Sequence, residues 1–172
     1  MPFTTLDPKV DETALPNETP KALALRLAIA KAQTPLAPGS AWILGSDQVL
    51  TCKSNILGKP GSRDNAIRQL EMCSGSKVTF YTAVCLANGT LKYCDTRIVQ
   101  TDVSFRSLSR NDIEAYVEQE PAFDCAGSFK VEGLGISLFT EVRSSDPTAL
   151  EGLPLISVYD LLLNAGVRPV AD

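Results

Sequence analysis

The chain has 172 residues, of which 44% are hydrophobic and 21% are charged, enough apolar content for one globular domain with its own core. Its net charge of -4 argues against sequence-independent nucleic-acid binding, which requires a basic surface, although a small anionic substrate needs only a few local cations. Because the chain contains no histidine, Ser-His-Asp triads, Cys-His pairs and histidine zinc sites are excluded, and acid–base chemistry falls to Asp, Glu, Lys, Tyr or water.

The first predicted helix covers Lys21 to Gln33, because apolar residues recur there at helical spacing. Thr19 suits the N-cap of this helix, and Pro20 suits its first turn. The turn-forming residues Pro35 and Pro38-Gly39 predict its end. An irregular N-terminal stretch therefore leads into one helix.

A short apolar run from Ala41 to Leu44 predicts a buried strand that stops at Gly45. The polar residues Ser46 to Gln48 follow directly. Asp47 is therefore expected at the C-terminal edge of a sheet, where α/β folds form ligand crevices. The alternative for Asp47 is a local role, in which its carboxylate forms an Asx turn.

The middle of the chain predicts a helix followed by a pair of long strands. Gly58 to Gly61 form a loop, and Ser62 caps a helix that ends at Cys73. Lys77 to Ala87 and Leu91 to Phe105 are predicted strands, joined by a hairpin at Asn88-Gly89.

The last part of the chain adds two helices and one more strand. Ser109 caps a helix with Ile113, Tyr116 and Val117 on its inner face. Ile136 to Phe139 is a predicted strand, and Pro154 starts a final helix that Gly166 closes. Strands and helices mixed along the whole chain predict an α/β fold with a single domain and a mixed, twisted sheet flanked by helices.

The five cysteines have no C-x-x-C spacing, which favours buried thiols over disulfides or a metal site and indicates a reducing compartment. No apolar run reaches the ~18 residues of a membrane span. The N-terminus has no signal-peptide pattern. The sequence therefore predicts a cytoplasmic protein without a membrane partner.

Short polar segments recur at the predicted ends of elements: Val10-Asp11-Glu12-Thr13, Arg26-Leu27-Ala28 with Lys31-Ala32, Gly45-Ser46-Asp47-Gln48-Val49, Gly58-Lys59-Pro60, and Cys125 to Gly135. A closing Gly152-Leu153-Pro154-Leu155 follows them. Each segment by itself is a weak indication of a family, because such short motifs occur by chance. Together and in this order they resemble the Maf family of nucleotide pyrophosphatases over essentially the whole chain, 1–172. The resemblance implies a Maf/ITPase-like fold with a central crevice.

The resemblance also implies a reaction. The branch it indicates hydrolyses 7-methyl-GTP to 7-methyl-GMP and diphosphate, which removes a modified nucleotide before it enters nucleic acid. In the family the residue matching Asp47 is the catalytic acid–base group, and the residue matching Glu12 helps to build a metal site. Two carboxylates with substrate phosphates suit Mg²⁺ or Mn²⁺. The alternative for Glu12 is a solvated acidic loop.

Lys31 and Lys59 are expected to contact the phosphates. The family places its matching lysines near the triphosphate, where an ammonium acts as a point charge. We expect Lys31 to bind substrate and Lys59 to act with Asp47 in catalysis. For both lysines the alternative is an ordinary solvated surface residue.

Gln48 and Glu132 are the candidates for base recognition, because members of the 7-methyl-GTP branch carry Gln and Glu at these places. A carboxylate accepts both N–H donors of the guanine pairing edge, and methylation at N7 adds positive charge to the ring. A pyrimidine has one N–H between two carbonyls and suits an amide better. Glu132 therefore argues against the dTTP and UTP branch; its alternative is a surface residue in a glycine loop.

Family members normally begin with an apolar strand and a Ser-x-x-Arg turn that binds phosphates, and Met1-Pro2-Phe3-Thr4 aligns with the segment after it. About twenty residues, one strand and part of a helix, are thus expected to be missing. The missing strand would expose a sheet edge that can pair with a second copy, which favours a homodimer, although the sequence does not determine the oligomeric state.

Two rival hypotheses remain open from the sequence. The first is the same reaction on dTTP and UTP. The second is a non-catalytic nucleotide-binding protein that regulates cell division, which the missing arginine turn favours and the set Asp47, Lys59 and Glu132 opposes.

Overall fold

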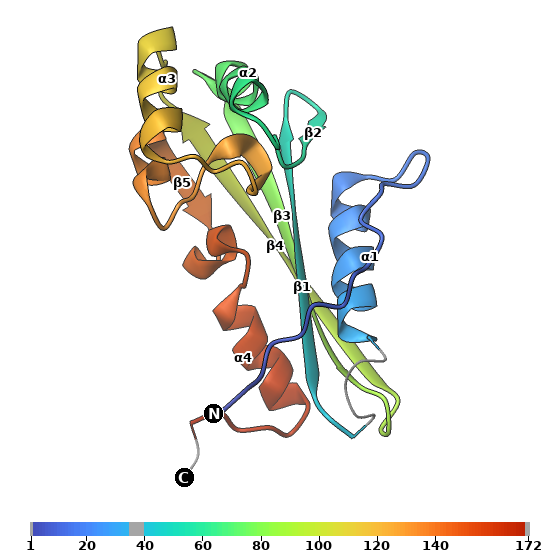
Figure 1. The fold of residues 1–172 in the computed structure, drawn as a ribbon. Coiled ribbons are helices and arrows are strands. Elements are labelled where there is room, and N and C mark those ends of the chain that lie inside the picture. The colour runs from blue at the N-terminus through green and yellow to red at the C-terminus, as the bar shows by residue number, and fades with distance from the viewer. Residues whose placement is uncertain (1, 35–39, 171–172) are drawn as a thin grey trace. The chain divides into compact units, whose positions relative to one another are not determined.

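The computed structural model describes residues 2–34 and 40–170, which form the α/β arrangement of Figure 1. By their contacts these residues divide into two compact units. The first unit takes its residues from Met1–Gln48, Thr82–Val99 and Asp146–Asp172, and the second from Val49–Tyr81 and Gln100–Ser145. Three strands contribute residues to both units. That the whole chain acts as one domain stays a prediction.

Five strands form one sheet in the order β2-β1-β3-β4-β5, which confirms the predicted α/β class. Both outer pairs are antiparallel, with Leu50 opposite Leu57 and Val103 opposite Val142. The strands are β1 (Ile43–Cys52), β2 (Asn55–Leu57), β3 (Lys77–Asn88), β4 (Tyr93–Phe105) and β5 (Phe139–Ser144).

In the first unit, helix α1 (Pro20–Ala32) packs directly on β1. Thr19 caps it, as predicted, by accepting a hydrogen bond from the backbone N–H of Ala22. A Cβ atom added at Gly45 would lie 2.4 Å from both Ala28 O and Ala32 N, so glycine lets the helix backbone lie against the strand. The predicted helix end at Pro35 and Pro38-Gly39 lies outside the described residues.

Helix α4 (Leu155–Asn164) packs on the same unit through a separate apolar cluster. The Trp42 and Tyr93 rings meet edge to face beside this cluster, with centroids 5.2 Å apart. Figure 1 shows α1 in blue and α4 in red on the two sides of strands β1, β3 and β4. The cluster consists of the buried residues Val84, Leu86, Val158, Leu161 and Leu162.

In the second unit, helices α2 (Arg63–Cys73) and α3 (Arg110–Gln119) have the predicted caps. Ser62 accepts from the backbone of Asn65, and Ser109 forms a capping box with Asp112. Four phenylalanine rings pack edge to face in the core of this unit, with centroids 5.0 to 5.8 Å apart: Phe80, Phe105, Phe129 and Phe139.

Three predicted boundaries are wrong. Strand β1 does not stop at Gly45 but continues to Cys52, so the segment Gly45 to Gln48 lies inside a strand. The connection after β3 is four residues long, because Asn88 stays in the strand and its side chain accepts from the backbone N–H of Leu91. The stretch Leu134–Leu138 is a 3-10 helix, and β5 starts only at Phe139.

The cysteines agree in part with the prediction. All five are free thiols; Cys52, Cys73 and Cys85 are buried, Cys125 is half-buried and Cys94 is exposed. Within the described ranges, none of the helices has the length and apolar content that crossing a membrane requires.

Candidate functional site

The side chains of β1 alternate between two faces, and this alternation separates the predicted site residues. Gly45 and Asp47 face α1, since a Cβ at Gly45 would touch that helix and Asp47 contacts Lys31 of α1. Ser46 and Gln48 donate hydrogen bonds to the turn near Gly152 on the other side. Asp47 was predicted at the edge of a sheet; it lies instead within a strand.

A three-membered charge cluster forms on the α1 side. Lys31 Nζ lies 2.6 Å from Asp47 Oδ1 and 2.8 Å from Glu12 Oε1. The Asp47 side chain is only 9% exposed, while that of Glu12 is 51% exposed, so the cluster extends from the strand toward solvent. Burial acts to lower the pKa of Lys31, but its hydrogen bonds to Asp47 and Glu12 outweigh burial, and the pKa is raised. Lys31 is therefore a cation at neutral pH.

The loop that carries Glu12 is fixed to α1 by Arg26. The guanidinium binds both carboxylate oxygens of Glu18, at 2.7 and 2.9 Å, and also donates to the backbone carbonyl of Thr13. The hydrogen bond from Arg26 lowers the pKa of Glu18 to about 2. Asp11 accepts from the backbone N–H of Thr13, which closes a turn around Glu12.

Gln48 binds the turn that precedes α4. Its amide nitrogen donates to Thr82 Oγ1 at 2.9 Å, Ala149 O at 2.8 Å and Leu150 O at 3.3 Å. Ser46 Oγ lies 2.7 Å from Gly152 O on the same turn. These contacts occupy the side-chain donors of Gln48 and Ser46 with backbone carbonyls and the Thr82 hydroxyl.

Asp146 continues this network into α4. It is 1% exposed and accepts from the backbone N–H groups of Ile156 and Ser157, in the first turn of a helix whose N-cap residue, Pro154, forms no side-chain cap. A second oxygen accepts from Thr148. The face of β1 opposite Asp47 thus positions a helix, through a turn that Asp146 stabilises.

Lys59 lies in the second unit, exposed in a loop whose backbone is fixed on both sides. Gln69 Nε2 donates to Gly58 O at 3.0 Å, and Asn65 Nδ2 donates to Pro60 O at 2.8 Å. Both donors come from α2, so the backbone on either side of Lys59 is bound to that helix while its side chain faces solvent.

Glu132 also lies in the second unit and is exposed in the loop Lys130 to Gly135. The loop is closed by hydrogen bonds from the backbone N–H groups of Gly133 and Gly135 to Lys130 O. Tyr116 of α3 and Glu120, the C-cap residue of that helix, contact it from outside.

The structure thus brings Glu12, Lys31 and Asp47 into contact and places Gln48 on the opposite face of β1. Lys59 and Glu132 each belong to an ordered loop of the second unit. The ion pair Arg26–Glu18 was not predicted, although Arg26 lies within one of the family-like segments and Glu18 directly precedes the N-cap of α1.

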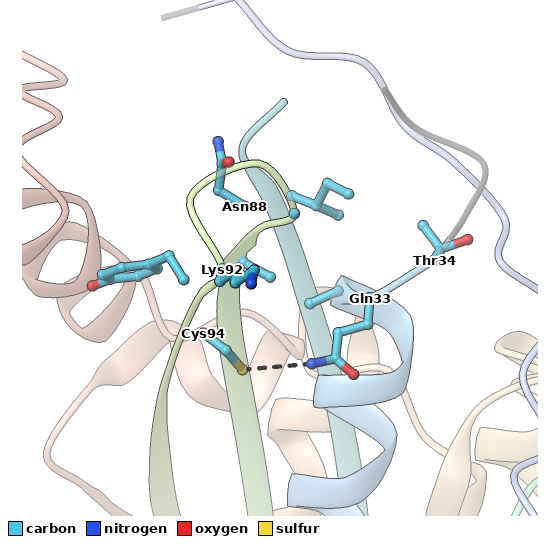
Figure 2. A pocket seen from close by; sticks show the side chains of 10 residues that line it. Gln33, Thr34, Asn88, Lys92 and Cys94 are labelled. Atoms are coloured by element: carbon cyan, nitrogen blue, oxygen red, sulfur yellow. Dashed lines mark hydrogen bonds between the residues drawn. The ribbon is translucent and has the colours of Figure 1, made fainter. Parts of the chain in front are cut away.

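A cavity of about 480 Å³ lies elsewhere in the first unit, between the end of α1 and the β3–β4 hairpin. Figure 2 shows Gln33 at its wall, with its amide directed toward Cys94 of β4. None of the predicted site residues lines this cavity.

Known proteins resemble this chain over almost its whole length. Residues 1–165 match the family described as Maf-like protein. A 7-methyl-GTP pyrophosphatase of Idiomarina loihiensis is 47% identical over 171 residues, 98% of this chain and 86% of that protein. Proteins with the same description from Xanthomonas axonopodis pv. citri and Aliivibrio fischeri are 50% and 47% identical, each covering 96% of this chain and 87% and 86% of their own length. The chain belongs to the Maf family.

Proposed function

We propose that this chain is a 7-methyl-GTP pyrophosphatase, which hydrolyses 7-methyl-GTP to 7-methyl-GMP and diphosphate. Relatives described by this activity are about half identical to it over nearly its whole length. The observation that carries the proposal is the cluster of Glu12, Lys31 and Asp47, because it combines two carboxylates and a cation at one place.

The donor set of this cluster fits a hard divalent cation. Glu12 and Asp47 already share one cation, the ammonium of Lys31, so a divalent ion held by both carboxylates would displace that ammonium toward the substrate phosphates. In the part of the chain that the structure describes, no group of three or more His, Cys, Asp and Glu could hold a metal. Mg²⁺ or Mn²⁺ suits such a sparse set, since these ions take their other ligands from water and substrate phosphates. Bound there, the ion would neutralise charge that develops on the leaving diphosphate.

Asp47 is the candidate general base. Its carboxylate accepts the proton of a water whose oxygen forms a bond to the α-phosphorus, while the bond from that phosphorus to the bridging oxygen breaks and diphosphate leaves. Lys31 is hydrogen-bonded to Asp47 and carries a raised pKa, so it stays protonated and acts as a cation toward Asp47 and the phosphates. We assign Lys59 to the phosphates as a second cation.

We assign recognition of the base to Glu132 and a structural role to Gln48. The exposed carboxylate of Glu132 can accept from the N–H donors of a guanine edge. The amide nitrogen of Gln48 already donates to three oxygens of its own unit. Base reading by the amide nitrogen of Gln48 would require it to give up these contacts, and only the amide oxygen could accept from a base without doing so.

The test is diphosphate release from 7-methyl-GTP, GTP and UTP with Mg²⁺ or Mn²⁺, by the wild type and Asp47→Asn. We expect Asp47→Asn to lose about 10²-fold or more in kcat, the ordinary contribution of a general base. Thermal unfolding of both proteins is the control. Equal rates would exclude the mechanism, and a wild-type preference for UTP would exclude the 7-methyl-GTP assignment.

A further inference from the structure

The loop that carries Glu132 is bound to α3 by one carboxylate oxygen. Glu120 Oε2 accepts from the backbone N–H of Leu134 at 2.8 Å and from the hydroxyl of Tyr116 at 3.0 Å. The Tyr116 oxygen in turn accepts from the backbone N–H of Lys130 at 3.4 Å. Both ends of the loop therefore connect to the same pair of side chains, one in the last turns of α3 and one at its C-cap.

Gly133, the residue after Glu132, lies directly against the Glu120 carboxylate. A Cβ atom at this position would lie 1.9 Å from Glu120 Oε1 and 2.7 Å from its Cδ. The carboxylate thus occupies the space that a side chain at residue 133 would need. The same carboxylate accepts the hydrogen bond from the backbone N–H of Leu134, which holds the backbone on the C-terminal side of Glu132.

We propose that Glu120, together with Tyr116, is a positioning residue for base selectivity that fixes the loop of Glu132; this inference rests on the proposed function. The Glu132 side chain is exposed, so the direction of its carboxylate depends on the backbone that carries it. A recognition group needs supporting contacts to stay within a fraction of an ångström of its working position. Glu120 and Tyr116 supply those contacts without touching a substrate.

Tyr116 stays a hydrogen-bond donor in neutral and mildly alkaline solution. It is buried, and burial raises the pKa of its phenol well above the ordinary value. The hydroxyl therefore stays protonated and continues to donate to Glu120 in mildly alkaline solution.

The test compares kcat/KM for 7-methyl-GTP with kcat/KM for UTP in each variant. The ratio of the two is independent of the fraction of folded enzyme, so a loss of stability cannot change it. We expect Glu120→Ala to lower this ratio by roughly tenfold, toward that of Glu132→Ala, because a displaced carboxylate no longer discriminates between base edges.

Two further variants give the matched controls. In Glu120→Gln one amide oxygen can take the place of Oε2 and accept both hydrogen bonds, so the ratio should stay within about twofold of the wild type. Glu118→Ala, at an exposed position on the same helix, should leave the ratio unchanged.

Tyr116→Phe keeps the hydrogen bond from Leu134 to Glu120 but removes the contact with Lys130. It should lower the ratio in the same direction as Glu120→Ala, but by less.

The outcomes separate the inference from the proposed function. A wild type without preference for 7-methyl-GTP would overturn the function itself. A wild type with that preference, together with an unchanged ratio in Glu120→Ala and Tyr116→Phe, would overturn the positioning role and leave the function intact. A fall of equal size in Glu118→Ala would also overturn it, because the effect would then be one of helix charge.

Discussion

Asp47 and Gln48 are neighbours in β1, but their side chains lie on opposite faces of the strand. Asp47 Oδ1 binds Lys31 Nζ at 2.6 Å, whereas Gln48 Nε2 donates to Ala149 O at 2.8 Å. Changes at these two positions should therefore have different consequences, the first for turnover and the second for the stability of the turn before α4.

Gln48→Leu should destabilise the protein by about 1–3 kcal/mol, because buried carbonyl oxygens lose a donor and gain no water in its place. The affected acceptors are Ala149 O, Leu150 O and Thr82 Oγ1. Urea unfolding measures the change, with Gln119→Leu at an exposed position as the control. An unchanged free energy of unfolding would show that the Gln48 hydrogen bonds contribute nothing.

Gly45→Ala should lower both stability and activity. The added methyl group would lie 2.4 Å from backbone atoms of Ala28 and Ala32, so α1 must move away from β1 at a cost of roughly 1–3 kcal/mol. Since Lys31 lies on α1, its distance to Asp47 should increase and kcat should fall. Gly58→Ala, where the methyl group meets nothing within 4 Å, is the control for stability. Equal melting temperatures for both variants would contradict the close contact.

Glu18 should make stability depend on pH at the acidic end. Its hydrogen bond with Arg26 lowers its pKa from 4.5 to about 2 in the folded chain, so the stabilisation is fully present above pH 4.5. It is lost as the pH falls from 4.5 toward 2, because the unfolded chain takes up the proton first. The difference in melting temperature between wild type and Glu18→Gln should shrink across this window. A difference that stays constant down to pH 2 would exclude the linkage, and Glu118→Gln is the matched control.

Cys94 should be the first thiol to react with an aryl disulfide reagent in the native protein, because it is the exposed one of the five. Its neighbour Cys85, with the two sulfur atoms 3.4 Å apart, should react slowly, since burial raises the pKa of Cys85 to about 12. Mass spectrometry after short labelling identifies the site. The fast phase should disappear in Cys94→Ser and persist in Cys125→Ser; fast labelling of Cys85 in the native state would contradict the burial.

Much of the fold follows from local signals in the sequence. Thr19, Ser62 and Ser109 mark helix starts because a capping hydroxyl acts within three residues of itself. The course of β1 does not follow from local signals. Gly45 usually indicates a turn, and only the close approach of α1, distant in sequence, explains a glycine inside that strand.

The candidate site also combines features that the sequence predicts with features that depend on contacts distant in sequence. The resemblance to the family indicated Glu12, Lys31 and Asp47, and the structure places these three in contact. The opposite orientation of Gln48 depends on the strand period, and a strand predicted to end at Gly45 does not extend that period to residue 48. The roles of Arg26 and Glu120 depend on contacts with backbone groups, for which side-chain identity carries little signal. The expected homodimer and central crevice stay predictions.

The alternation along β1 also has an evolutionary consequence. Mutations of Asp47 alter the geometry around Lys31, so natural selection would remove them through lost turnover, whereas mutations of Gly45 would be removed through losses of both turnover and stability. Mutations that reach Ser46 or Gln48 loosen a turn and a helix cap, so they would be removed through lost abundance of the folded enzyme, and a stabilising change elsewhere could rescue them. The neighbouring codons of Asp47 and Gln48 would thus accumulate changes under different constraints.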